Sequence, residues 1–263
     1  NKNIFGGIFQ YPGKNGKIQD LNPIIKKFRE KEINTIVAAD LLSLTLIKPP
    51  GEMGVDVVVG SSQRFGIPMG YGGPHAAFFA TKEIYKRNIP GRIIGETIDL
   101  DKRRALRMAL QTREQHIKRD RATSNICTAQ VLLAIMAGMY AIYHGPKGLK
   151  NIAKKIHEKS VNLSNALKSL GINQMNDCFF DTIMIKANSK IIRPIAERKK
   201  INFNYVDDEK ITISLNETTT INDLNKIISV FEEFTKNKIS KRYESIDENK
   251  SLKIHRRKSK FLI

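Results

Sequence analysis

A glycine-rich loop, FGIPMGYGGPH at residues 65–75, is the segment whose residue types most directly suggest a binding site. Its turn is formed by Gly70, Gly72, Gly73, Pro74 and His75. Glycines allow the backbone to turn at positive φ and to approach another group closely. The loop is neither a Walker A nor a dinucleotide motif, because it follows a strand but opens no helix. Taken alone, it favours a tight corner between two strands over a binding loop.

A second candidate site is the basic stretch TREQHIKRDRATSN at residues 112–125. The cationic side chains that could surround an anion are Arg113, His116, Arg119 and Arg121. A helix is expected to begin after them, and the free N–H groups of its first turn would also favour an anion. Thr123, Ser124 and Asn125 lie at that point. An equal alternative is a solvated basic loop in which one of these three residues only caps the helix.

The histidines and cysteines indicate neither a metal site nor a nucleophile. The five histidines show no HExxH motif and no paired spacing with cysteine. The two cysteines, Cys127 and Cys178, are too few for a disulfide scaffold, fit a reducing compartment and are most simply small buried residues. We therefore expect no metal and no catalytic side chain in this chain.

The first half of the sequence alternates between strand and helix patterns. Strands are predicted at residues 4–11, 34–40, 55–60 and 76–80, and a helix at 21–32. The run VDVVVG is continuously apolar or β-branched after its aspartate, as in a parallel strand covered on both faces. This order predicts an α/β fold with right-handed crossovers.

The second half predicts long helices followed by a smaller sheet. Residues 87–121 are highly charged and poorly periodic. One long helix is predicted at 124–149, stopped by Gly145 and Pro146, and another at 149–170. Further strands are predicted at 181–187, 201–206 and 210–215, with helices at 189–199 and 221–236.

These elements divide into two folding units and a tail. We expect a large α/β domain at residues 1–145 and a small α+β domain at 146–235. Residues 236–263 are basic, show little apolar periodicity, and are predicted to be a linker or tail. A chain of 263 residues is long enough to bury a substantial core.

Composition is that of a globular protein with an excess of basic residues. Hydrophobic residues make up 41% and charged residues 27% of the chain. No apolar run approaches the roughly 20 residues of a membrane helix. The formal net charge of +19 is spread along the sequence, and it is not interleaved with aromatic residues as in a single-strand nucleic-acid binder. Nucleic-acid binding is therefore not expected as the main function, whereas an acidic protein partner stays open.

Long strings of this sequence resemble the N-terminal half of the glycine cleavage P-protein family, the glycine dehydrogenases (decarboxylating). The similarity is densest in LIKPPGEMGVDVVVGSSQRFGIPMGYGGPHAAFFATKE and in LQTREQHIKRDRATSNICTAQ. In the family's catalytic half, the glycine loop follows the motif His-Lys-Thr-Phe, whose lysine forms the Schiff base. Aligning Phe65 with that Phe places Gln63 at the lysine. A glutamine cannot form an imine.

The resemblance implies a fold-type I pyridoxal-phosphate transferase-like large domain, incomplete at its N-terminus, with a small α+β C-terminal domain. Such enzymes hold the pyridine nitrogen with an aspartate at a strand end. An ungapped count places Val37 there, so Asp40 is expected to cap the segment that follows it. By analogy with fold-type I dimers, Thr123, Ser124 and Asn125 are the expected contacts in trans to the phosphate of the other half's cofactor. Pyridoxal 5'-phosphate is thus expected on the other half, and none covalently on this chain.

The family decarboxylates glycine and transfers the aminomethyl group to the lipoyl arm of the H-protein. The resemblance therefore implies a supporting half that is inactive alone and acts with the catalytic half and the H-protein, in a homodimer or heterotetramer. Neither nucleic acid nor a membrane is expected as a partner. The expected location is the cytoplasm, or the mitochondrial matrix in a eukaryote. The family's first half begins upstream of NKNIFGGIFQ, and HRRKSKFLI matches the linker where the family goes on toward its catalytic half, so the chain is expected to be a fragment. The alternative is a non-enzymatic remnant that binds an acidic partner.

Overall fold

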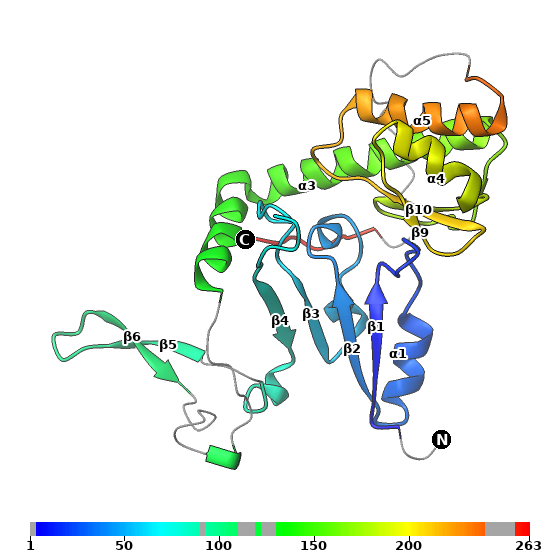
Figure 1. Ribbon diagram of the computed structural model, residues 1–263. Helices are drawn as coiled ribbons and strands as arrows, with labels where there is room; N and C mark the ends of the chain where they lie inside the picture. Colours follow the sequence, from blue (N-terminus) through cyan, green and yellow to red (C-terminus); the bar gives the residue numbers. More distant parts are fainter. Residues whose placement is uncertain (1–3, 90–92, 110–118, 122–129, 240–255) are drawn as a thin grey trace.

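The structure, a computed structural model, describes residues 4–89, 93–109, 119–121, 130–239 and 256–263. Its first part is built on a four-stranded sheet in the order β1-β2-β3-β4 (Figure 1). The strands are β1 (Gly6–Tyr11), β2 (Asn34–Ala39), β3 (Val57–Ser61) and β4 (Ala77–Thr81). The first three strands are parallel and β4 runs antiparallel to β3, which confirms the predicted α/β arrangement.

Helix α1 (Asn22–Arg29) connects β1 to β2 at the predicted place. Its apolar stripe buries Ile25, while Lys26, Lys27 and Arg29 occupy the last turn, where positive charge complements the helix dipole. The segment between β2 and β3, which prolines interrupt, forms two short 3-10 helices instead of an α-helix. The 3-10 helices within the described residues are η1 (Ser43–Thr45), η2 (Pro50–Met53), η3 (Glu83–Tyr85) and η5 (Arg119–Arg121).

A β-hairpin lies in the stretch where the sequence shows no periodicity. Strands β5 (Ile93–Ile98) and β6 (Arg104–Ala109) pair antiparallel, and the hairpin projects away from the main sheet (Figure 1). Several of its apolar side chains, including Ile98 and Leu106, are exposed. Because this hairpin has no buried face, its sequence does not show the alternation that marks a half-buried strand.

The long helix α3 (Val131–Ser169) is broken at Gly145, as predicted. Gly145 has φ 60° and ψ −179°, which is not helical, and Pro146 follows it. The predicted start of the first helical part, near residue 124, lies outside the described residues. Among the described residues, no helix combines the length and apolar character needed to cross a membrane.

The small domain is a second sheet covered by helices. Its strands are β7 (Asn173–Gln174), β8 (Thr182–Lys186), β9 (Asn204–Tyr205) and β10 (Lys210–Ser214), in the order β7-β8-β10-β9. Its helices are α4 (Ser189–Arg198) and α5 (Ile221–Thr235). Thr220 and Asp223 form a capping box that starts α5. All predicted elements of this region are present, and the two-residue β7 is an addition.

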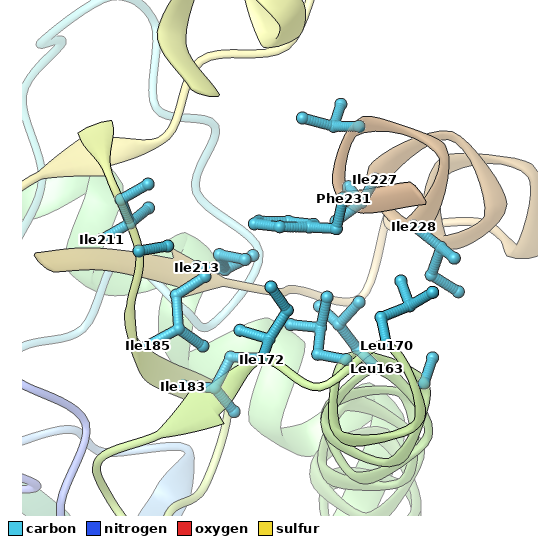
Figure 2. Packing of buried hydrophobic residues seen from close by; sticks show 14 of the residues in the cluster. Leu163, Leu170, Ile172, Ile183, Ile185, Ile211, Ile213, Ile227, Ile228 and Phe231 are labelled. Carbon is cyan, nitrogen blue, oxygen red and sulfur yellow. The ribbon is translucent and has the colours of Figure 1, made fainter. Parts of the chain in front are cut away.

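Two hydrophobic clusters meet along the second part of α3. The small-domain cluster joins α3, β8, β10 and α5, with Phe231 pointing from α5 into its centre (Figure 2). The large-domain cluster includes Ala153 and Ile156 of the same helix, together with Phe180. Helix α3 therefore contributes to both cores, and the domain boundary at residues 145/146 stays a prediction.

The end of the chain, predicted to be a linker or tail, is docked on the large domain at residues 256–263. The backbone N–H of Arg257 donates to the carbonyl of Leu46 at 2.7 Å. The Nη1 atom of Arg257 donates to the carbonyl of Leu44 at 2.8 Å. Arg257 thus satisfies two carbonyls of the segment that contains η1, and holds the tail in place.

Replacing Arg257 by alanine is expected to release this segment. The loss of the guanidinium contacts should cost about 1–3 kcal/mol, which corresponds to roughly fivefold to more than a hundredfold faster hydrogen exchange of the amide at position 257. Hydrogen exchange of the wild-type and variant chains measures this. Lys258→Ala, at a neighbouring exposed residue, is the control. An equal effect of both substitutions would contradict the anchoring role.

Candidate functional site

A cluster of charged side chains at the carboxyl ends of β2 and β3, the Arg64 cluster of Asp40, Arg64 and Asp181, is the candidate functional site. In open α/β sheets, ligands bind outside the carboxyl ends of the strands. Asp40 follows β2 directly, and Gln63 and Arg64 follow β3 two and three residues after its end. Asp181, immediately before β8, approaches from the small domain. The site therefore combines groups from both domains.

Arg64 lies at the centre of this cluster. Its Nη1 atom lies 2.8 Å from Oδ2 of Asp40 and also forms an ion pair with Asp181. Its guanidinium carbon lies 5.4 Å from the centre of the Phe180 ring, within the range of a cation–π contact. The buried Nη2 atom of Arg64 finds no hydrogen-bond partner among the described residues.

Burial and charge oppose each other in this cluster. Burial raises the pKa of Asp40, the positive charge of Arg64 lowers it, and Asp181 raises it further, so the pKa lies above its usual value. Burial lowers the pKa of Arg64, but the charges of Asp40 and Asp181 outweigh this effect and raise that pKa. The guanidinium is therefore firmly charged and balances two carboxylates.

Asp40 also contacts the segment that it was predicted to cap, although Leu42 and not Asp40 stands at the N-cap of η1. Its Oδ1 atom accepts a hydrogen bond from the backbone N–H of Leu42 at 3.0 Å, and its carbonyl accepts one from the Ser43 hydroxyl. The carboxylate thus stabilises the turn that leads into η1, which starts at Ser43 with Leu42 at its N-cap. Val37, the residue at the position expected for the cofactor's aspartate, is fully buried in the core.

The glycine loop joins β3 to the antiparallel strand β4. Gly70 and Gly72 have φ of 52° and 90°, as their predicted role in the turn requires, whereas Gly73 has no positive φ. Across the base of the loop, Oγ of Ser61 lies 2.9 Å from Nδ1 of His75. Pro74, next to His75, completes the turn. This geometry is that of a corner between two strands.

Gln63 is held at the start of this loop by its own backbone and side chain. Its N–H donates to Oγ of Ser61 at 3.1 Å, and its Nε2 atom donates to the carbonyl of Pro68 at 3.4 Å. The amide of Gln63 is therefore directed toward the loop backbone. The next residue, Arg64, pairs with Asp40 instead.

The second predicted anion site cannot be placed. Thr123, Ser124 and Asn125 lie outside the described residues, as do Arg113, His116 and Cys127. Arg119 and Arg121 belong to η5 and are exposed. Cys178, the described cysteine, is half-buried, and this burial raises the pKa of its thiol, which fits a packing role better than a nucleophile. Within the described ranges, no group of three His, Cys, Asp or Glu side chains could hold a metal ion.

Sequence reasoning missed Arg64, Asp181 and His157 as parts of this region. His157 of α3 donates from Nδ1 to the carbonyl of Phe180 at 2.8 Å, and burial lowers the pKa of its imidazole. An arginine beside a glycine loop was a visible signal. Its partner Asp181 was not, because 117 residues separate the two.

Comparison with known proteins identifies the family. The family model described as "Glycine cleavage system P-protein" matches residues 1–231. The chain belongs to this family. Glycine dehydrogenase (decarboxylating) from Christiangramia forsetii is 58% identical over 262 residues, which are all of this chain but 28% of the relative. The mitochondrial P-protein of Pisum sativum is 54% identical over 87% of this chain and 22% of its own length. The chain thus spans about a quarter of the curated relatives that it matches.

Solved structures confirm the predicted fold. The crystal structure of a glycine decarboxylase (P-protein) in inhibitor-bound form superposes with a TM-score of 0.81 at 32% identity, over 89% of this chain and 55% of that one. A NifS-like protein from Rickettsia africae superposes with a TM-score of 0.61 at 18% identity, over 88% of this chain and 62% of that one, which supports the fold alone. The P-protein chain described here therefore has the fold-type I architecture of pyridoxal-phosphate enzymes.

The described residues of the Arg64 cluster do not fit a covalently held pyridoxal phosphate. A Schiff base needs an amine, and Gln63 presents an amide bound to a backbone carbonyl. A pyridinium needs a carboxylate; Val37, at the position expected for it, has none, and the nearby Asp40 and Asp181 are both bound by Arg64. The chain retains the fold of its family, and the carboxylates of this cluster are engaged by a cation of the chain itself.

Proposed function

We propose that this chain is part of a glycine dehydrogenase (decarboxylating) and forms the half that lacks the Schiff-base lysine. The observation that carries the proposal is the pair Gln63 and Arg64: the first is an amide at the lysine position, and the second pairs with Asp40 and Asp181. The chain supports decarboxylation of glycine on a lysine-bearing half, which binds pyridoxal phosphate. That half then transfers the aminomethyl group to the lipoyl H-protein.

An exposed apolar face on the first part of α3 supports packing against the lysine-bearing half. Leu132, Ile135, Met139, Ile142 and Tyr143 lie near one side of this helix, and each is more than half exposed. Contiguous exposed apolar surface is typical of an interface. The assembly is a homodimer or heterotetramer, located in the cytoplasm or, in a eukaryote, in the mitochondrial matrix. Thr123, Ser124 and Asn125 remain the proposed contacts in trans to the cofactor phosphate.

Borohydride trapping of pyridoxal phosphate tests this function directly. The chain is assayed alone and mixed with the lysine-bearing half of the Christiangramia forsetii relative, and visible absorbance and glycine decarboxylation are recorded. We expect no trapped adduct on this chain, and decarboxylation in the mixture above the level of the lysine-bearing half alone. A trapped adduct on this chain by itself, or no increase in the mixture, would overturn the proposal.

A further inference from the structure

The junction between the two domains contains a cation supplied by the chain itself. We propose that the Arg64 guanidinium is an internal ligand of a planar-cation site formed by Asp40, Asp181 and the Phe180 ring. Bound there, it links the large domain to the small domain and excludes a pyridoxal cofactor from this junction. This role concerns the described chain alone and holds whether or not the chain assists a catalytic half.

The site draws its parts from three separate elements. Asp40 lies at the carboxyl end of β2, Arg64 follows β3, and Asp181 lies at the entry to β8 in the small domain. Phe180 is fully buried in the large-domain cluster and places its ring 5.4 Å from the guanidinium carbon. One arginine therefore contacts a strand end in each domain and an aromatic ring at their junction.

The ring contact of the site favours a planar, delocalised cation. Nη1 of Arg64 contacts both carboxylates, and its guanidinium carbon lies 5.4 Å from the centre of the Phe180 ring, whereas an ammonium is a compact, strongly hydrated charge. The side chains of Arg64, Asp40 and Asp181 are only 26%, 21% and 14% exposed. Glu217 and Tyr140 also face Arg64, and Glu217 adds a third negative charge nearby. Without the cation, these carboxylates would repel one another in a partly buried place.

Removal of Arg64 should create a site that a free guanidinium can fill. We expect Arg64→Ala to lower the thermal unfolding midpoint by about 5–10 °C. Methylguanidinium at millimolar concentration, well below denaturing levels, should raise the midpoint of this variant because it binds only the folded state. Methylammonium at the same concentration is the matched non-planar cation. Arg29→Ala is the matched variant, since Arg29 donates to the backbone carbonyl of Gly54 and, within the described part of the chain, pairs with no carboxylate.

Selective recovery of Arg64→Ala by methylguanidinium would support the proposal. It would be overturned by no recovery, by equal recovery with methylammonium, or by equal recovery of Arg29→Ala. If Arg64→Ala fails to fold, Arg64→Lys replaces it, because lysine keeps the charge but loses the planar group that lies over the Phe180 ring. A midpoint of Arg64→Lys equal to that of the wild-type chain would also overturn the proposal.

Exclusion of the cofactor is tested by restoring the lysine. Gln63→Lys alone should trap little pyridoxal phosphate under borohydride, because Arg64 still occupies both carboxylates. The double variant Gln63→Lys/Arg64→Ala should trap at least about tenfold more pyridoxal phosphate. Removing one strong competing ion pair changes a binding constant by about that factor. Equal trapping by the two variants would overturn the exclusion role.

Discussion

Replacing Phe231 by alanine is expected to lower the free energy of unfolding by about 3–5 kcal/mol, the usual cost of removing a buried phenylalanine ring. Phe231 of α5 is fully buried and points into the small-domain cluster (Figure 2). Its ring centre lies 5.6 Å from that of Phe203. Since domains are typically stable by only about 5–15 kcal/mol, this single change should leave the small domain marginally folded. Urea denaturation followed by circular dichroism measures the loss.

The matched control for this change is Phe5→Ala. The chemical change is identical, but the Phe5 side chain is 86% exposed, so we expect a cost within about 0.5 kcal/mol. Phe231→Leu, which keeps most of the apolar volume, should fall between the two. If Phe231→Ala and Phe5→Ala cost the same, the small-domain core would not depend on this ring.

Replacing Gly16 by alanine is expected to cost about 2–5 kcal/mol, because the turn after β1 fits tightly against the small domain. A Cβ at Gly16 would lie 2.1 Å from the carbonyl oxygen of Thr182, and Gly16 has φ 78°. The same turn is tied to the small domain by Asn176, whose side chain donates to the carbonyl of Asn15 at 3.0 Å. The added methyl group must therefore displace one domain from the other.

The cost at Gly16 has two causes, the positive φ and the close contact with Thr182, and Gly171→Ala separates them. Gly171 also has φ 78°, but a Cβ there would meet no atom within 4 Å. It should cost only about 1–2 kcal/mol, the penalty for a left-handed conformation. Thermal or urea unfolding of both variants measures the difference. Equal losses for Gly16→Ala and Gly171→Ala would show that the contact with Thr182 does not hold the domains together.

The Arg64 cluster belongs to a wider junction between the two domains. At one end of that junction Gly16 lies against Thr182, and the Asn176 side chain donates to the carbonyl of Asn15. Arg64 and Asp181 join the domains at the cluster itself. The junction is therefore held by contacts between the chain's own residues.

The order and type of most elements were determined by the sequence alone. The apolar runs of β1 to β3, the helical spacing of α1, and the break of α3 at Gly145 depend on residues close together in the chain. Long strings of residues also identified the family, and the loss of the lysine at Gln63 was inferred by aligning them. Such features are local, so periodicity and motif spacing record them.

Only the tertiary structure decided which residues meet. The hairpin β5–β6 has no buried face and so left no pattern, and the docking of Arg257 on η1 brings the end of the chain back to its first domain. The pairing of Arg64 with Asp181 spans 117 residues. These contacts depend on how separately folded elements pack against one another. No local pattern encodes that packing, because the free energy of each contact depends on burial that only the assembled domains provide.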